Sequence, residues 1–171
     1  DSLIHGERLS LDAHHQEIRG LAFSPDGTLF ASCAGLWGRS APGEIIVWNA
    51  DSGEPVWVFT DHQSPVMGVA FHPNGQWVAS ASIGGSGVGF IAVHDVTTGE
   101  RIHRIESQSY SVAFDPTGKM LAAGGLDGDV QLWDAATAEQ VDSLGGQKGS
   151  VFSAAWSSDG VILATGSRDG T

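Results

Sequence analysis

Four copies of one short motif recur along this chain, and this repetition constrains the fold more than any other feature. Each copy contains two small or apolar residues, an aromatic residue and a tight turn that ends in glycine. The copies are residues 21–27, 69–75, 112–118 and 154–160, and their aromatic residues are Phe23, Phe71, Phe114 and Trp156. A period of about 20–50 residues is typical of repeat proteins, in which each unit buries its apolar surface against its neighbours.

The remainder of each repeat predicts short strands separated by turns. A run of small and apolar residues follows the turn glycine, and the next apolar run ends in an aromatic or histidine residue, as in residues 121–123 and 130–134. Proline and glycine favour tight turns because proline presets φ and glycine tolerates positive φ. No segment shows the sustained 3.6-residue apolar period of a helix. The sequence therefore predicts an all-β fold with a four-stranded antiparallel meander in each repeat.

The distribution of small and large residues indicates how these meanders are arranged. Alanine followed by alanine, serine or threonine lies at the same place in the second strand of every copy, whereas Trp48 and Trp133 end the third strand. Residues 45–48 are apolar on both faces, so their sheet must be covered on both sides. Sheets that radiate from an axis crowd together at their inner strands, where small residues fit. The pattern therefore predicts a β-propeller with four-stranded blades.

The repeat resembles a known family. Trp133 is followed by Asp134 and Trp48 by Asn49, and at this period both pairs resemble the tryptophan–aspartate (WD) repeat of β-propellers. The resemblance covers essentially all 171 residues. It implies a module that holds other proteins, but it implies no particular process, because the family serves many processes.

The resemblance also implies a buried tetrad in each blade, made of histidine, serine or threonine, aspartate and tryptophan. The matching residues are His14, Ser32 and Trp48 in the first blade, His62 and Ser80 in the second, Asp127 and Trp133 in the third, and Thr165 and Asp169 in the fourth. No blade is complete. The first lacks a matching aspartate, and the second has His94 instead of tryptophan. The third has no histidine and has Ala123 instead of a hydroxyl, and the fourth has Gln147 instead of histidine. We therefore expect uneven polar clusters in which each missing partner is replaced or hydrated.

The phase of the repeat suggests how the chain is divided into blades. The expected segments are 15–61, 62–105 and 106–146 for three blades, 147–171 for an incomplete fourth, and 1–14 for the outer strand of a preceding or closing blade. Because four blades is the low end of the usual range of about 4–8, we expect this chain to form part of a ring of seven or eight blades. Its open faces would then pair with the remaining blades or with a second copy.

Composition restricts the partners. The chain carries 20 acidic and 8 basic residues, for a formal net charge of −12. Such a surface repels phosphate, which argues against nucleic acid and anionic membranes and leaves two interpretations, simple solubility or a basic protein partner. No apolar run approaches the ~20 residues of a transmembrane helix, and residues 1–6 do not resemble a signal peptide. We therefore expect a soluble protein without membrane insertion and favour the cytoplasm.

Motifs for catalysis, metals and cofactors are missing from the sequence. It contains no CxxC, HxxxH or GxSxG motif, and residues 84–89 are rich in glycine without fitting GxGxxG. Residues 127–129 read Asp-Gly-Asp but lack the further acidic ligands of a calcium loop, so we expect a β-turn there. We therefore expect no bound metal, no cofactor and no enzymatic activity.

Two long connections between the second and third strands are the candidate partner-binding loops. They lie in the first and second repeats and contain Leu36, Trp37, Arg39, Ser86 and Val88. Insertions on one face of a repeat protein often mark the binding side, although surface loops also vary freely. Tryptophan and arginine are enriched at binding hot spots. We therefore expect a non-catalytic scaffold within a protein assembly; the alternative is an accessory propeller of a larger enzyme or signalling protein.

Overall fold

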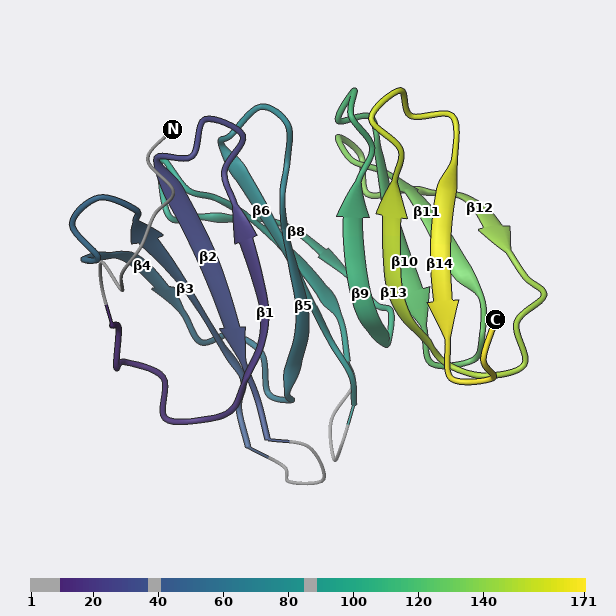
Figure 1. Ribbon diagram of the computed structural model, residues 1–171, viewed down its shortest axis with the longest axis horizontal. Helices are drawn as coiled ribbons and strands as arrows, with labels where there is room; N and C mark the ends of the chain where they lie inside the picture. Colours follow the sequence, from purple (N-terminus) through teal and green to yellow (C-terminus); the bar gives the residue numbers. More distant parts are fainter. Residues whose placement is uncertain (1–9, 37–40, 85–88) are drawn as a thin grey trace, which may run out of the picture.

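The computed structural model describes residues 10–36, 41–84 and 89–171, which form antiparallel β-sheets (Figure 1). Blade 1 contains β1 (Ile18–Phe23), β2 (Leu29–Ala34), β3 (Glu44–Asn49) and β4 (Pro55–Phe59). Blade 2 contains β5 (Val66–Phe71), β6 (Trp77–Ser82), β7 (Ile91–Asp95) and β8 (Arg101–Ile105). Blade 3 contains β9 (Ser109–Phe114), β10 (Met120–Gly125), β11 (Val130–Asp134) and β12 (Gln140–Leu144), and blade 4 contains β13 (Val151–Trp156) and β14 (Leu163–Ser167).

In each of the first three blades the strands pair in chain order as a meander, and in blade 4 the two strands form a hairpin. No α-helix occurs in the described ranges, and so no helix there could cross a membrane. The predicted all-β fold and the four-stranded antiparallel blades are confirmed.

The turn between the first two strands has the same construction in every blade. Gly27, Gly75, Gly118 and Gly160 have φ values of 72°, 73°, 74° and 73°, a region that residues with a Cβ rarely adopt. In blade 1 the Ser24 hydroxyl donates to the Asp26 carboxylate at 2.6 Å. The glycine therefore recurs in every turn of this kind, whereas proline precedes it in blades 1–3 and an acidic residue only in blades 1 and 4.

The blades follow one another across the molecule, and their first strands β1, β5, β9 and β13 lie beside one another in that order (Figure 1). A separate apolar core fills each space between neighbouring blades. Between blades 1 and 2 it contains Ala31, Cys33, Ile45, Val47 and Phe59 from one side and Val66, Val69, Val78 and Val96 from the other. Similar clusters join blades 2 and 3 and blades 3 and 4. Each blade is thus sealed by its neighbours, as the repeat pattern predicts.

Residues at one repeat position show this dependence directly. Leu21, Val69 and Val112 occupy the same place on the first strands of blades 1, 2 and 3, because each lies two residues before the strand's aromatic residue. Leu21 is 67% exposed, whereas Val69 is 9% and Val112 is 7% exposed. Blades 2 and 3 have a described blade in front of them and blade 1 has none, so the neighbouring blade accounts for the burial.

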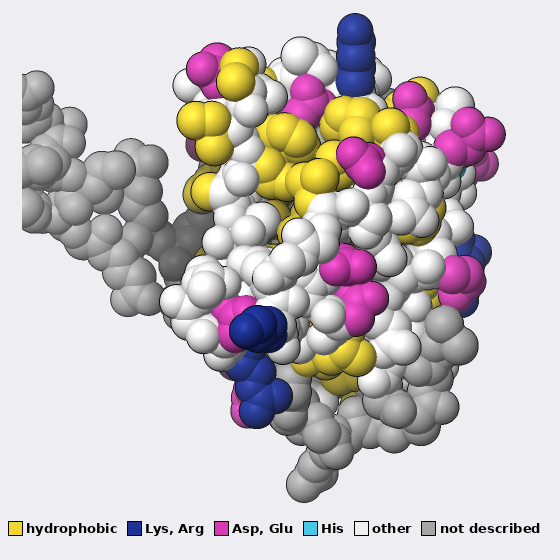
Figure 2. Space-filling model, turned by 90° about the vertical axis from the view of Figure 1, so that its right-hand side faces the viewer, with side chains coloured by type: hydrophobic (Ala, Val, Ile, Leu, Met, Phe, Trp, Pro, Cys, Tyr) yellow, Lys and Arg dark blue, Asp and Glu magenta, His cyan; other side chains and the backbone are white. Residues whose placement is uncertain are grey.

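The C-terminal side of the stack also exposes apolar side chains. The large exposed apolar residues of β12 and blade 4 are Val141, Leu144, Phe152, Val161 and Ile162. Figure 2 shows this side of the molecule, with apolar side chains gathered in its upper part and carboxylates around them. No further blade covers this side within the described part of the chain.

We predict that Gly68→Ala destabilises the blade stack. A Cβ at Gly68 would lie 2.9 Å from the Tyr110 carbonyl oxygen and 3.0 Å from the Ser111 Cα, both on the first strand of the next blade. Relieving these contacts requires β5 and β9 to move apart, at a cost of about 1–3 kcal/mol. Urea unfolding measures the loss. Gly166→Ala is the matched control, because the nearest atom to its Cβ would be 4.0 Å away, and an equal loss in both variants would contradict the prediction.

Candidate functional site

The polar cluster of blade 1 joins β2, β3 and the segment before β1 through one hydroxyl. The Ser32 hydroxyl lies 2.5 Å from His14 Nε2 and accepts a hydrogen bond from Trp48 Nε1 at 2.8 Å. His14 Nδ1 lies 2.8 Å from a carboxylate oxygen of Glu44. The structure therefore brings His14, Ser32 and Trp48 together. Glu44, at the start of β3, supplies the carboxylate that the sequence pattern left unfilled.

The cluster of blade 2 is centred on a fully buried histidine. His62 Nε2 lies 2.8 Å from the Ser80 hydroxyl, and His62 Nδ1 lies 2.9 Å from the Ser82 hydroxyl. Its ring stacks on Phe90 with centroids 4.3 Å apart. Burial disfavours the charged ring and lowers the pKa of His62 to about 4. The ring is therefore neutral in the folded protein at pH 7.

A second group in blade 2 contains His94, which stands where the family pattern has tryptophan. The ring stacks on Phe59 of blade 1 with centroids 4.0 Å apart, and its Nε2 lies 3.5 Å from Asp61. Arg101 donates to the same Asp61 oxygen at 2.6 Å. Burial acts to raise the pKa of Asp61, but His94 and Arg101 outweigh it and hold this pKa well below its usual range. These contacts of Asp61 link the segment after β4 of blade 1 to β7 and β8 of blade 2.

Sequence reasoning missed Asp61 because it lies outside the expected tetrad positions. The adjacent His62 did match the pattern, so an acidic residue beside a tetrad histidine was the available signal. Asp61 Oδ1 is buried without a hydrogen-bond partner among the described residues.

Blade 3 has no cluster of this kind in the described part of the chain. Trp133 Nε1 is buried without a partner, since Ala123 offers no hydroxyl at the position of Ser32 and Ser80. Asp127 is exposed and accepts one long hydrogen bond, 3.3 Å, from the backbone nitrogen of Asp129. The structure thus leaves the two predicted tetrad residues of this blade, Asp127 and Trp133, without a hydrogen bond to each other.

The remaining predicted positions lie in blade 4. Asp169 accepts hydrogen bonds from the backbone nitrogen of Lys148 at 2.5 Å and from the Thr171 hydroxyl at 2.7 Å. These bonds lower the pKa of Asp169 to about 2. Thr165 is half-buried on β14, and Gln147 Oε1 is buried without a partner among the residues described.

The bases of the two candidate loops meet at Pro65, which precedes β5. A Cβ at Gly35 would lie 2.5 Å from the Pro65 Cα, and the Ile83 nitrogen donates to the Pro65 carbonyl at 3.4 Å. Leu36 donates its backbone N–H to Gln16 Oε1 at 3.0 Å. The other four candidate residues, Trp37, Arg39, Ser86 and Val88, lie outside the described residues.

The described titratable side chains form no metal site, and the thiol of Cys33 is buried. In residues 10–36, 41–84 and 89–171, no three histidine, cysteine, aspartate or glutamate side chains are grouped to hold a metal ion. Cys33 is buried between blades 1 and 2, and burial raises the pKa of its thiol to about 12. Such a thiol stays protonated at neutral pH and packs as a small apolar residue.

Meander blades, shared turns and cores between the blades define a propeller-type repeat protein, and sequence comparison assigns the family. This chain belongs to the WD40 family: the family model "WD domain, G-beta repeat" matches residues 7–49, 53–86, 99–134 and 138–171. The predicted resemblance to WD repeats is confirmed.

Three curated proteins illustrate which sequences this chain is similar to. "Periodic tryptophan protein 2 homolog" of Dictyostelium discoideum is 29% identical over 94% of this chain. "WD repeat-containing protein VIP3" of Arabidopsis thaliana is 35% identical over 74%, and "Pre-mRNA-processing factor 19 homolog 2" of the same plant is 28% identical over 96%. The aligned parts make up 17%, 44% and 31% of these relatives, so the chain spans less than half the length of each.

We predict that Ser32→Ala destabilises blade 1. The substitution leaves the buried Trp48 Nε1 and His14 Nε2 without their shared partner, which costs about 1–3 kcal/mol. Thermal or urea unfolding measures the loss. Ser143→Ala is the control, because Ser143 is exposed on the outer strand β12. A Ser32→Ala variant as stable as the Ser143→Ala variant would show that the cluster contributes nothing.

We also predict a loss of stability on acidification that originates at His62. The pKa of His62 is about 4 in the folded protein, below the usual histidine value of 6.5. As the pH falls below 6.5, the unfolded chain therefore binds the proton first, and the free energy of unfolding falls until about pH 4. Between pH 7.5 and 5 the expected loss is about 2 kcal/mol.

Unfolding measured at a series of pH values tests the size of this loss, and an NMR titration tests its origin. The His62 ring should remain neutral at pH 5 in the folded protein, and a His15→Gln variant, which changes an exposed ring, should keep the same pH dependence. A His62 ring that is protonated at pH 6 in the folded protein would contradict the prediction.

Proposed function

We propose that this chain is a non-catalytic scaffold that docks partner proteins on the end of the blade stack formed by the β2–β3 and β6–β7 connections. The observation that carries the proposal is that the bases of the two loops converge on Pro65, on adjacent blades. Loops held by a rigid β-framework are favourable binding elements, because the framework is already ordered before the partner arrives.

Two further observations support a protein partner. One relative is named as a pre-mRNA-processing factor, and another is named "Telomerase protein component 1". Proteins with this repeat fold therefore carry names that refer to different processes. The formal charge of −12 favours basic protein surfaces over phosphate-bearing ones. A role in protein assemblies therefore fits this chain better than nucleic-acid binding.

We predict that the double substitution Trp37→Ala and Arg39→Ala removes partner capture. The intact protein, immobilised and incubated with extract of its native cells, retains partners that mass spectrometry identifies. If these two side chains are binding hot spots, their loss should lower the amount of captured partner by about 10-fold or more.

Lys119→Ala is the control, because Lys119 is an exposed basic residue at the opposite end of the blades. Equal circular dichroism spectra and melting temperatures for the three proteins would exclude misfolding as the cause. Undiminished capture by the double variant would remove this loop from the interface, and the absence of any specific partner would contradict the scaffold function.

A further inference from the structure

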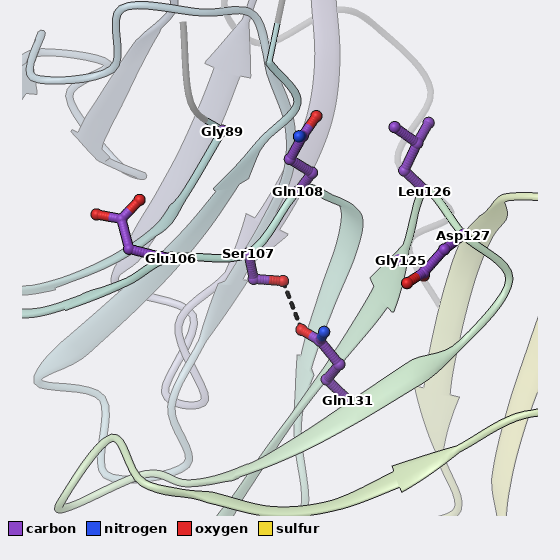
Figure 3. A pocket seen from close by; sticks show the side chains of 8 residues that line it. All are labelled: Gly89, Glu106, Ser107, Gln108, Gly125, Leu126, Asp127 and Gln131. Carbon is purple, nitrogen blue, oxygen red and sulfur yellow. Dashed lines mark hydrogen bonds between the residues drawn. The ribbon is translucent and has the colours of Figure 1, made fainter.

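A pocket of about 540 Å³ lies between blades 2 and 3, at the same end of the stack as the candidate loops (Figure 3). It is lined by Gly89, Glu106, Ser107, Gln108, Gly125, Leu126, Asp127 and Gln131. Gln108 Oε1 accepts a hydrogen bond from the Gly84 nitrogen at 3.2 Å, which joins the pocket wall to the base of the β6–β7 connection.

The pocket occupies the place that a histidine fills one blade earlier. The link from β4 to β5 is residues 60–65 and contains the buried His62, whereas the link from β8 to β9 is only residues 106–108. The registers of the two sheets align Ser80 and Ser82, which hold His62, with Ala123 and Gly125. The shorter link and the two smaller residues leave space where blade 2 has a ring.

The polar groups around this space have unused hydrogen-bonding capacity. The Ser107 hydroxyl donates to Gln131 Oε1 at 2.6 Å and lies 2.8 Å from the Ser109 hydroxyl. The Gln131 side chain is thereby fixed, and its amide nitrogen has no acceptor among the residues described. Figure 3 shows the Asp127 carboxylate pointing toward the space between it and Gln131. Only one Asp127 oxygen has a partner in the described structure, the Asp129 nitrogen at 3.3 Å.

The charge of the pocket is negative. Its described lining contains two carboxylates, Glu106 and Asp127, and no lysine or arginine. Arg104 neutralises Glu106 in part, because its Nε donates to Glu106 at 2.7 Å while its guanidinium lies 3.7 Å from the centre of the Phe90 ring. Asp127 is therefore the unpaired charge that a ligand would meet.

We infer that this pocket binds the arginine side chain of an extended segment of a partner protein. A guanidinium offers donors in a fixed fork that the Asp127 carboxylate can accept. The Gln131 amide nitrogen can donate to a backbone carbonyl of the same segment, and the chain's acidic surface attracts its positive charge. The volume lies within the range of about 300–1,000 Å³ typical of ligand pockets and leaves room for backbone beside the side chain. This inference rests on the proposed function and adds to it the chemistry of the partner.

Titration of the chain with two peptides tests the inference. The probes are acetyl-Ala-Ala-Arg-Ala-Ala-amide and the same peptide with citrulline, which has the shape of arginine without its charge. We expect the arginine peptide to cause saturable NMR shifts in the Gln131 side-chain amide and in the backbone amides of residues 125–127. The citrulline peptide should bind about 10-fold more weakly, since it cannot form the charge-assisted hydrogen bond with the Asp127 carboxylate.

Two variants with equal changes of charge locate the site. Asp127→Asn should weaken binding of the arginine peptide about 10-fold, whereas Asp51→Asn, an exposed residue at the opposite end of blade 1, should leave it unchanged. The inference is overturned if millimolar arginine peptide leaves residues 125–127 and Gln131 unshifted. It is also overturned if both variants bind the arginine peptide equally, because attraction to the acidic surface alone would explain that result. Equal binding of the two peptides overturns it as well, because the charge of the guanidinium would then contribute nothing.

The peptide titration and the capture experiment test different claims, so a negative result in one does not decide the other. If partners are captured but the arginine peptide does not bind, the scaffold function stands and the pocket is not its arginine site. If the peptide binds at Asp127 but no partner is captured, the pocket stands and the proposed function falls.

Discussion

The burial of apolar surface between neighbouring blades is the interaction on which the rest of this structure depends. A single four-stranded meander has two faces and cannot cover either one itself. Residues such as Val47 and Val66 belong to one apolar core between blades 1 and 2, and their burial contributes roughly 25 cal/mol per Å² of apolar surface. The small residues of the inner strands follow from the same packing, because the backbone of one blade lies almost in contact with Gly68 of another.

The sequence predicted the blades because both the turns and the strands repeat. Turn glycines and alternating apolar runs act locally, so four copies reinforce one interpretation. The polar clusters were less predictable. Glu44 completes the cluster of blade 1 from a strand, and Asp61 pairs with His94 across two blades. A hydrogen bond requires only that two atoms meet in space, and residues at different repeat positions can meet there. The positions of the predicted tetrad therefore did not identify the partners.

The pocket between blades 2 and 3 illustrates how a repeat protein can gain a site without changing its fold. Loss of a tetrad histidine from blade 3 removes a buried ring, while the strands keep their registers. The sequence recorded that loss as a missing histidine and an alanine, but it could not indicate that the space stays open. That outcome depends on the length of the β8–β9 link and on the direction of the Gln131 and Asp127 side chains. The same rigid blades can thus carry different loops and pockets at one end.

Two residues at the same repeat position offer the most direct measurement of how far a neighbouring blade stabilises the fold. Ile18 and Val66 both begin the first strand of a blade; Ile18 is 54% exposed, whereas Val66 is 0% exposed against the preceding blade. Each is replaced by alanine in the 171-residue chain and the free energy of unfolding is measured. Burial between neighbouring blades predicts a loss of about 2 kcal/mol for Val66→Ala and of less than about 1 kcal/mol for Ile18→Ala. A loss for Ile18→Ala that equals or exceeds that for Val66→Ala would contradict it.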